Sequence, residues 1–216
     1  MVPALEELDK RGILPSIRRV GGTSIGSVTA TLVALNYKVD EIYRTVMDLN
    51  FTSMLDDSWG VVRDLDRLIH EYGWYKGDWL RKIVGELIGA KTGNPGVTFA
   101  DLEKMKGAHG FRSPYFIGTN LSTHFADTYS FEHTPDMCVA DAVRISMSLP
   151  VIFAAKRNAR GDVCVDGGTV DVYPVKLFDQ VKYVEDPRSV RSTDYYEREN
   201  RAIDRVGNPV SRLIYS

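Results

Sequence analysis

The chain has 216 residues, of which 44% are hydrophobic and 26% charged, a composition typical of one soluble globular domain or slightly more. Its formal net charge of −2 argues against nucleic acid as the main partner, because binding to phosphates needs a surplus of basic residues. No apolar run approaches the roughly 18 residues that a membrane-spanning helix needs, and the first residues lack a secretory signal pattern. We therefore expect a cytoplasmic protein or one that contacts membranes peripherally.

The first 51 residues predict three helices and one short strand. Apolar residues at helical spacing favour helices over residues 2–14, 24–37 and 38–51. Residues 15–22 begin with a proline and run through apolar positions into two glycines, which is typical of a short strand. Asp40 is a candidate cap for the third helix, because its side chain can accept a hydrogen bond from the first-turn backbone.

The block of residues 52–97 contains all three tryptophans among glycines and charged residues. Residues 61–73 and 77–90 both fit amphipathic helices, and Thr98 is a candidate cap for a further helix after the block. Two interpretations remain open here. The block is either a helical lid or insertion over a site, or ordinary helical packing.

The second half of the chain turns to strands. The candidate strands share short apolar cores and span residues 113–123, 125–133, 151–155 and 163–165. A helix is predicted over residues 133–150, where Thr134 caps it, Pro135 takes the first position and Pro150 ends it. From about Gln180 onward the chain is highly charged with little periodicity, which favours a surface loop or tail. Helices alternating with short strands indicate an α/β domain.

The two cysteines, Cys138 and Cys164, are too few for a disulfide framework or a metal site. We expect both to be buried or half-buried free thiols, because an unpaired cysteine behaves as a small apolar side chain. The sequence predicts no metal and no cofactor.

The stretch from Gly22 to Gly26 matches the pattern G-x-S-x-G, between a predicted strand and a predicted helix. A nucleophile on such a sharp turn has a strained backbone, and we expect side chains two residues before and after Ser24 to collide. Glycine at Gly22 and Gly26 would remove that collision. The alternative is a glycine-rich start of a helix, with Ser24 as its cap.

A nucleophilic serine needs a base, and the order of residues narrows the choice. The histidines follow Ser24 and precede Asp166, so a triad in the order Ser, Asp, His cannot use Asp166; they are His70, His109, His124 and His133. An order Ser, His, Asp with one of these histidines stays open. The neighbourhoods of the four favour surface or packing positions instead.

Asp166 is the outstanding carboxylate base. It follows the apolar run Val163–Val165 and precedes Gly167 and Gly168, so it should lie at the end of a strand in a tight turn. Open α/β sheets place their site residues at such strand ends. The alternative is an Asp-Gly turn that closes a hairpin.

The pair of Gly22–Gly26 and Asp166–Gly168 resembles the signature of patatin-like phospholipases. The segments GTNLST, FEHTPDMCVADAVRISMSLPVIF and DGGTVDVYPV are similar to blocks of that family in the same order. The resemblance covers about residues 1–175. It implies a three-layer α/β/α sandwich with a central, mostly parallel sheet. It also implies an acyl hydrolase without a metal, in which Ser24 is the nucleophile and Asp166 the general base.

The resemblance also gives expectations for the oxyanion hole and the domain organisation. That family has a glycine-rich segment of the type G-G-x-[RK]-G ahead of the first helix, and none precedes Met1 in this sequence. We therefore expect the first strand to be missing, which leaves the Ile25 N–H as the one assignable oxyanion donor. The catalytic domain is expected at residues 1–178 and a charged tail at residues 179–216.

The implied substrate is a phospholipid or a lysophospholipid. The run SLPVIFAA and the tryptophan-bearing block are candidates for an acyl entry surface, and Lys156, Arg157 and Arg160 for contact with a headgroup. The alternatives are plain core and plain solvated surface. Val172 stands where the family commonly has asparagine, which we interpret as a difference in packing. The alternative function is a non-catalytic or truncated module that binds a lipid or a protein partner.

Overall fold

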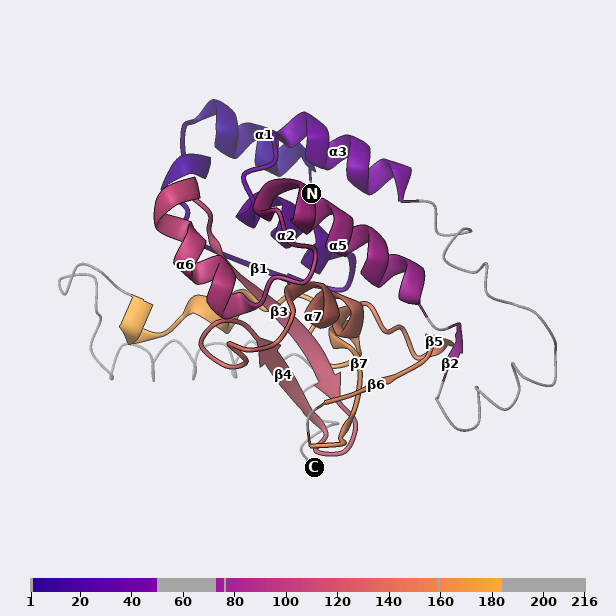
Figure 1. Ribbon diagram of the computed structural model, residues 1–216. Coiled ribbons are helices and arrows are strands. Elements are labelled where there is room, and N and C mark those ends of the chain that lie inside the picture. Colours follow the sequence, from indigo (N-terminus) through magenta and orange to yellow (C-terminus); the bar gives the residue numbers. More distant parts are fainter. Residues whose placement is uncertain (1, 50–72, 76, 159, 184–216) are drawn as a thin grey trace. The chain divides into compact units, whose positions relative to one another are not determined.

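The computed structural model describes residues 2–49, 73–75, 77–158 and 160–183 of the chain (Figure 1). The chain divides into two compact units, Met1–Pro174 and Val175–Ser216, each described by itself below. The first unit contains the helices and the sheet, and the expected α/β class is confirmed. The boundary after residue 178 and the helical lid stay predictions, and residues 52–72 of the proposed lid lie outside the described residues.

The first quarter of the chain forms the elements that its patterns predict. They are α1 (Val2–Lys10), the 3-10 turn η1 (Leu14–Ser16), β1 (Arg19–Thr23), α2 (Ile25–Ala34) and α3 (Val39–Asp48). Every residue of α2 from Ser27 onward is buried, as its small and apolar sequence indicates. The prediction of Asp40 as a cap is wrong. Lys38 is the cap residue of α3, because the Glu41 carboxylate reaches back to accept its backbone N–H at 2.8 Å.

The middle of the chain adds one predicted helix pair and one strand that the sequence did not indicate. The helices are α5 (Asp78–Thr92) and α6 (Phe99–His109). Thr98 caps α6 as predicted, since its hydroxyl oxygen accepts the Asp101 N–H at 3.1 Å. The short strand β2 (Gly73–Tyr75) pairs in parallel with β5 (Val151–Phe153). Because β2 is only three residues long, it lacks the alternation that identifies a strand in a sequence.

The second half forms β3 (Ser113–Asn120), β4 (Phe125–Tyr129), α7 (Val139–Ser146), β6 (Lys156–Arg157) and β7 (Val163–Asp166). The predicted start of α7 at Thr134 is wrong. Residues 134–138 instead run beside the start of α6, where the carbonyls of Pro135 and Met137 accept the N–H groups of Ala100 and Phe99. Those donors have no acceptor within α6, so the neighbouring segment satisfies them at the expense of its own helix.

The main sheet is mixed. Its order is β1–β3–β7–β6, with β4 also paired to β3. Only β1 and β3 are parallel, whereas β3–β4, β3–β7 and β6–β7 are antiparallel, so the expectation of a mostly parallel sheet is wrong for the described strands. For two of these pairs the reason is local: short turns join β3 to β4 and β6 to β7, and a short turn can only join antiparallel neighbours.

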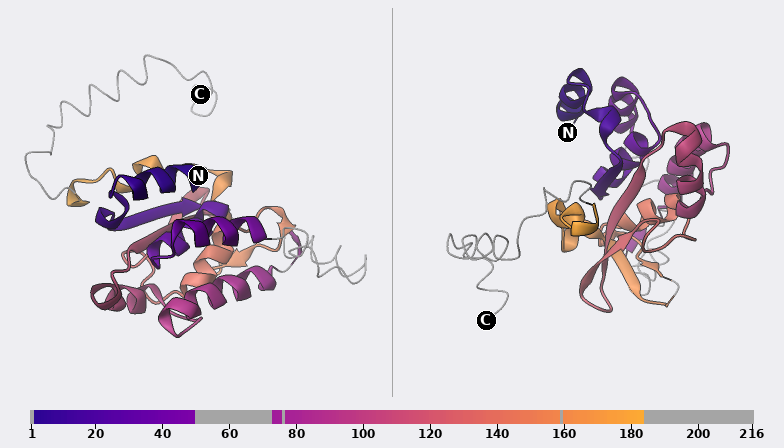
Figure 2. Two further views of the ribbon diagram at one scale, coloured as in Figure 1. Left: turned by 90° about the horizontal axis from the view of Figure 1, so that it is seen from above. Right: turned by 90° about the vertical axis from the view of Figure 1, so that its left-hand side faces the viewer.

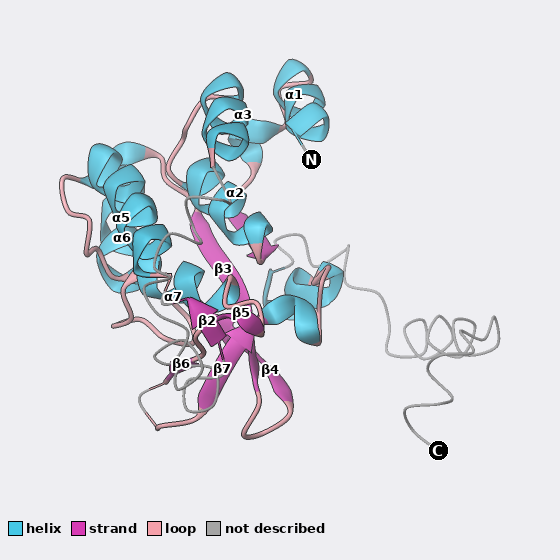
Figure 3. Cartoon of the chain, turned by 90° about the vertical axis from the view of Figure 1, so that its right-hand side faces the viewer, coloured by secondary structure: helices cyan, strands magenta, loops and turns pink. Residues whose placement is uncertain are grey.

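The helices cover the sheet in successive layers (Figures 1 to 3). Both α2 and α7 pack on the strands, α5 packs on α7, and α3 packs between α2 and α1. The core between them is apolar, and its fully buried members include Leu32, Phe116, Val143 and Ile88. Every residue of β3 is buried, as its central place in the sheet requires.

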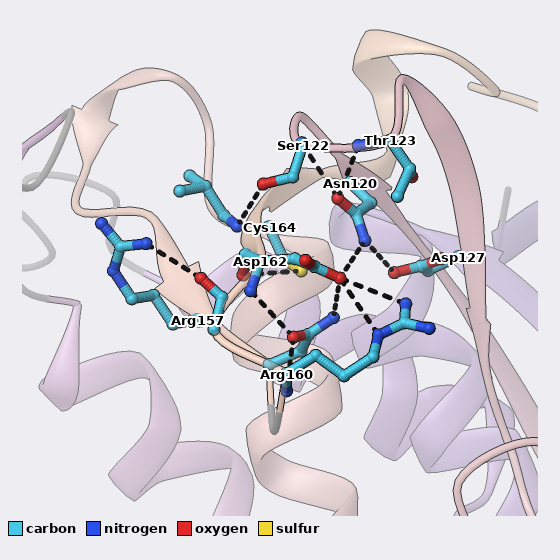
Figure 4. Close-up of polar contacts among 11 residues, drawn as sticks. Asn120, Ser122, Thr123, Asp127, Arg157, Arg160, Asp162 and Cys164 are labelled. Atoms are coloured by element: carbon cyan, nitrogen blue, oxygen red, sulfur yellow. Dashed lines mark hydrogen bonds and ion pairs between the residues drawn. The ribbon is translucent and has the colours of Figure 1, made fainter.

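A polar network ties the two hairpin turns of the sheet together (Figure 4). The Asn120 Nδ2 group donates to carboxylate oxygens of both Asp127 (3.1 Å) and Asp162 (3.0 Å). The same Asp162 oxygen accepts from Asn158 at 3.0 Å and from Arg160 Nε at 3.2 Å. Hydrogen bonds from Asn158 and Asn120 lower the pKa of Asp162. The network fixes the end of β3 against the start of β7.

The second unit begins with two 3-10 turns, η4 (Val175–Phe178) and η5 (Val181–Tyr183). The rings of Phe178 and Tyr183 meet edge to face with centroids 5.9 Å apart. None of the described helices of either unit combines the length and the apolar character needed to cross a membrane.

Candidate active site

Ser24 occupies the single position between β1, which ends at Thr23, and α2, which begins at Ile25. Its φ of 54° and ψ of −130° are uncommon for a residue with a side chain, so the turn is strained. The Ser24 side chain makes no cap hydrogen bond to α2, which contradicts the alternative that it is merely a helix cap. The turn is instead held by its carbonyl oxygen, which accepts from Ser27 N at 2.8 Å and from Ser27 Oγ at 2.6 Å.

The structure requires glycine at only one of the two glycine positions of the motif. A Cβ atom at Gly22 would overlap the Gly26 carbonyl oxygen and lie 2.8 Å from Ser27 N, so the predicted collision is confirmed there. At Gly26 the prediction is wrong, because an added Cβ would meet nothing within 4 Å. The turn brings the backbone of Gly26 over the α-carbon of Gly22, while the α-carbon of Gly26 faces open space.

Ser24 and Asp166 meet because two strands converge on one edge of β3. Both β1 and β4 pair with Phe116, so they lie on opposite edges of β3. Both β7 and β4 pair with Gly118, so β7 lies on the same edge as β1. The two strands run in opposite directions, and each ends where they meet: Thr23 opposite Ile117, and Asp166 opposite the next residue. The residue after β1 and the last residue of β7 are therefore neighbours.

The side chains of Ser24 and Asp166 are hydrogen-bonded. The Ser24 hydroxyl donates to Asp166 Oδ2 at 2.6 Å, and the Gly168 N–H donates to Asp166 Oδ1 at 2.7 Å. Only 1% of the Asp166 surface is exposed. Burial raises the pKa of this carboxyl, and the hydrogen bonds from Ser24 and Gly168 oppose that rise without cancelling it. The arrangement is a buried carboxylate placed to accept the proton of a hydroxyl.

Neither glycine after Asp166 has room for a Cβ atom without a close contact. A Cβ atom at Gly167 would overlap the Ile117 carbonyl, 2.7 Å from its carbon and 2.9 Å from the Thr23 methyl carbon. At Gly168 it would lie 3.0 Å from the Asp166 Oδ1 oxygen, tighter than an ordinary contact. The turn that the sequence pattern suggested at Asp-Gly-Gly exists, and it directs the carboxylate at Ser24.

Two serines at the end of α7 hold the pair, and the sequence reading missed both. The Ser146 hydroxyl oxygen accepts the Ser24 backbone N–H at 3.0 Å and donates to the Ile117 carbonyl at 2.7 Å. The Ser148 carbonyl accepts the Asp166 backbone N–H at 2.8 Å. Neither serine is exposed. Serine at buried positions of an apolar helix was the available signal, because a buried hydroxyl needs a partner.

Arg144 fixes this end of α7 from inside the core. Its Nη1 donates to Ser148 Oγ at 2.5 Å and its Nη2 donates to the Ala154 carbonyl at 3.0 Å. Burial lowers the pKa of the guanidinium to about 10, so it stays charged at neutral pH. The segment with Ser146 and Ser148, which bonds the backbone of Ser24 and Asp166, is thus fixed by the buried guanidinium of Arg144.

Replacing Ser146 by alanine is expected to weaken this arrangement. The change leaves the Ser24 N–H and the Ile117 carbonyl without their partner, and an unsatisfied buried group costs about 1–3 kcal/mol. We expect a lower melting temperature and, for any reaction at Ser24, a rate reduced by about 10- to 100-fold. Thr31→Ala is the matched control, because it removes a buried hydroxyl that bonds only the Ser27 carbonyl, at 2.8 Å. Equal rate losses in both variants would refute a positioning role for Ser146.

The described histidines do not join the pair. His133 Nδ1 shares a hydrogen bond of 2.7 Å with Ser130 Oγ, and the His109 ring stacks on Phe111. His124 lies in the β3–β4 turn with a φ of 64°. None of these three hydrogen-bonds Ser24 or Asp166 within the described part of the chain, and His70 lies outside the described residues.

The expected lipid-contacting residues fall into three groups. Lys156 pairs with Asp78 at 3.7 Å, Arg160 with Asp162 at 3.1 Å, and Arg157 donates to the Gly161 carbonyl at 2.9 Å. These basic side chains already have partners. Of the run SLPVIFAA, Leu149 and Ile152 are exposed, whereas Phe153 and Ala154 are buried. Trp79 packs half-buried against the core; Trp59 and the side chain of Trp74 lie outside the described part.

The remaining site predictions concern metals, thiols and Val172. No three acidic, histidine or cysteine side chains among the described residues are grouped to hold a metal ion. Cys138 is half-buried and Cys164 buried, and both are free thiols, as predicted. The prediction that Val172 reflects packing is wrong, since 74% of its surface is exposed.

Comparison with known proteins assigns the chain to one family. The model of the patatin-like phospholipase family matches residues 2–179. The chain is 31% identical over 180 residues to the uncharacterized protein R571 of Acanthamoeba polyphaga mimivirus, covering 83% of this chain and 57% of that protein. It is 29% identical over 184 residues to the uncharacterized protein YqhO of Bacillus subtilis (strain 168), covering 81% and 60%. The chain therefore spans about three fifths of these relatives.

Two solved structures share the fold. VipD from Legionella pneumophila matches with a TM-score of 0.67 and 19% identity, over 80% of this chain and 44% of that one. Full-length ExoU of Pseudomonas aeruginosa, solved in complex with SpcU, matches with a TM-score of 0.51 and 22% identity, over 69% and 35%. At these identities the likeness concerns the fold alone.

Proposed function

The chain belongs to the patatin-like phospholipase family, and we propose that it hydrolyses carboxylic esters of lipids, of the phospholipase A or lysophospholipase type. Ser24 is the proposed nucleophile and Asp166 the proposed general base. The observation that carries the proposal is the 2.6 Å hydrogen bond from the Ser24 hydroxyl, on its strained turn, to the buried Asp166 carboxylate.

The proposed reaction has two halves. In the first, Asp166 accepts the Ser24 proton while Oγ attacks the ester carbonyl carbon, and the alcohol leaves with that proton as the acyl-enzyme forms. In the second, Asp166 takes a proton from water while the hydroxide attacks the acyl carbon. Ser24 Oγ then leaves and receives that proton from Asp166, which releases the fatty acid and restores both residues. Ile25 begins α2, so its N–H has no acceptor within the helix and is the proposed oxyanion donor.

The proposed substrate is a phospholipid or a lysophospholipid, met at the membrane surface. The family name supports a lipid substrate. ExoU was solved with the protein SpcU bound, which supports a protein partner as a further possibility for the whole protein.

Covalent labelling tests the proposal directly. The full natural chain is incubated with a fluorophosphonate probe, which reacts with activated serines, and the modified peptide is identified by mass spectrometry. We expect the label on Ser24 and a loss of labelling when a long-chain ester competes. The buried Ser27, which lies beside the turn but bonds a carbonyl oxygen, serves as the internal control. No labelling of the folded protein would favour the alternative of a binding module without catalysis.

A further inference from the structure

We propose that the loop after the Asp166 turn, residues 168–173, inserts its apolar side chains into a lipid surface whose headgroups are electrically neutral. The inference rests on the proposed lipid hydrolysis and adds the surface through which the site would reach its substrate. The loop contains Val170, Val172 and Tyr173, and we call it the apolar loop.

Exposure singles out the apolar loop. Val170 is 54% exposed, Val172 74% and Tyr173 80%, so three large side chains within four residues face solvent. Single exposed apolar residues are ordinary on a protein surface, whereas a cluster beside a functional site marks an interaction surface. Tyr173 suits the boundary between lipid and water, because its ring is apolar and its hydroxyl polar.

The backbone of the apolar loop is anchored to the proposed active site. The Gly167 carbonyl accepts the N–H groups of Val170 at 3.1 Å and Asp171 at 2.8 Å. The hydroxyl of Thr23, the residue before the nucleophile, donates to the Asp171 carbonyl at 3.1 Å. These bonds satisfy polar groups that would otherwise oppose entry into an apolar medium. They also tie the loop to both β1 and the Asp166 turn.

A second exposed segment adjoins the backbone of Asp166. Ser148 holds the Asp166 N–H, and the next residue, Leu149, is 39% exposed, with Ile152 close behind at 42%. Exposed apolar side chains are therefore attached to the backbone on both sides of Asp166, in the apolar loop and in the segment after Ser148. An ester that enters from a bilayer would meet apolar surface on its way to Ser24.

Charge decides which lipid surface fits. The apolar loop contains one residue that is charged at neutral pH, Asp171, and no lysine or arginine, while the net charge of the chain is −2. The basic candidates Lys156 and Arg160 already pair with Asp78 and Asp162. Attraction to anionic headgroups is therefore not the driving force that the described surface favours. The described surface instead favours binding that is driven by the burial of apolar side chains, which salt does not screen.

Vesicle flotation tests the inference without relying on hydrolysis. The full chain carrying Ser24→Ala is mixed with phosphatidylcholine vesicles at low and high salt, with and without Val172→Ser and Tyr173→Ser. The matched control replaces two other exposed apolar residues, Met47 (65%) and Phe125 (71%), by serine. We expect the double loop variant to bind at least about tenfold more weakly and the control to bind normally, with little effect of salt.

The outcomes separate the inference from the proposed function. Equal binding by the loop variant, no binding by the chain carrying Ser24→Ala alone, or binding that disappears at high salt would each overturn the inference. With Ser24 restored, the loop variant should lose hydrolysis of vesicle lipid but keep hydrolysis of a short-chain, water-soluble ester. Vesicle binding through the loop without any hydrolysis would leave the inference standing and the proposed function refuted.

Discussion

Asp166→Asn is expected to abolish ester hydrolysis while the protein stays folded. The amide cannot accept a proton at neutral pH, and losing a positioned general base costs about 100- to 10,000-fold in rate. The asparagine can keep both native contacts, because its oxygen can accept the Gly168 N–H and its NH₂ can donate to Ser24 Oγ. Turnover of a soluble ester and the melting temperature, measured side by side, check both halves of the prediction.

The pKa of Asp166 predicts the direction in which this substitution changes the stability of the protein. Burial raises the pKa of Asp166 above 3.8, the ordinary value of an aspartate, so the folded state favours the protonated form more than the unfolded chain does. The contribution of Asp166 to stability therefore falls as the pH rises from 3.8 through the raised pKa, and the penalty is complete at neutral pH. We expect the asparagine variant to be at least as stable as the natural chain at pH 7. A large drop in melting temperature would show that the ionised carboxylate is needed for folding.

The same raised pKa predicts the pH dependence of the natural protein. Only the ionised carboxylate can take the Ser24 proton, so the activity of the natural protein should fall on acidification with a midpoint above 3.8. Alanine substitutions at His109, His124 and His133 serve as controls, and each should leave the rate within a few-fold. A folded histidine variant without activity would contradict the assignment of Asp166 as the base.

The sequence indicates Ser24 and Asp166 as the candidate pair but not how they meet. The motif and the order of the histidines directed attention to a carboxylate base, and the flanking glycines placed it in a turn. The meeting depends on β1 and β7 sharing one edge of β3, which is a long-range pairing without a local signature. The support from Ser146 could not be predicted for the same reason, since its partners Ser24 and Ile117 are far away in the chain.

Errors at element boundaries also trace to contacts between distant segments. Thr134 and Pro135 form a persuasive helix start, yet carbonyls of that segment bond the N-terminus of α6, and the helix begins only at Val139. Strand β2 exists through its pairing with β5. Local patterns were reliable where nearly every residue of a segment is buried, as in α2 and β3, and failed where a neighbour supplied the hydrogen bonds.

Gly22→Ala is expected to prevent stable folding, because the added methyl group meets only backbone. It would overlap the Gly26 carbonyl oxygen and approach Ser27 N to 2.8 Å, and neither can rotate away as a side chain would. Overpacking against backbone at a strained turn falls among the severe substitutions, above about 4 kcal/mol, out of a total stability of about 5–15 kcal/mol. We expect insoluble protein, or a melting temperature lowered by about 10 °C or more.

Gly26→Ala supplies the matched control within the same motif. The added methyl group would meet nothing within 4 Å, and alanine is a better helix former than glycine in the first turn of α2. This variant should be soluble, with an unchanged or slightly raised melting temperature. If both variants fold equally well, the close approach at Gly22 is not what fixes the turn. If both fail, the second glycine has a role in folding that open space around its α-carbon does not explain. A difference between the two variants would show that glycine is required for steric reasons at Gly22 but not at Gly26.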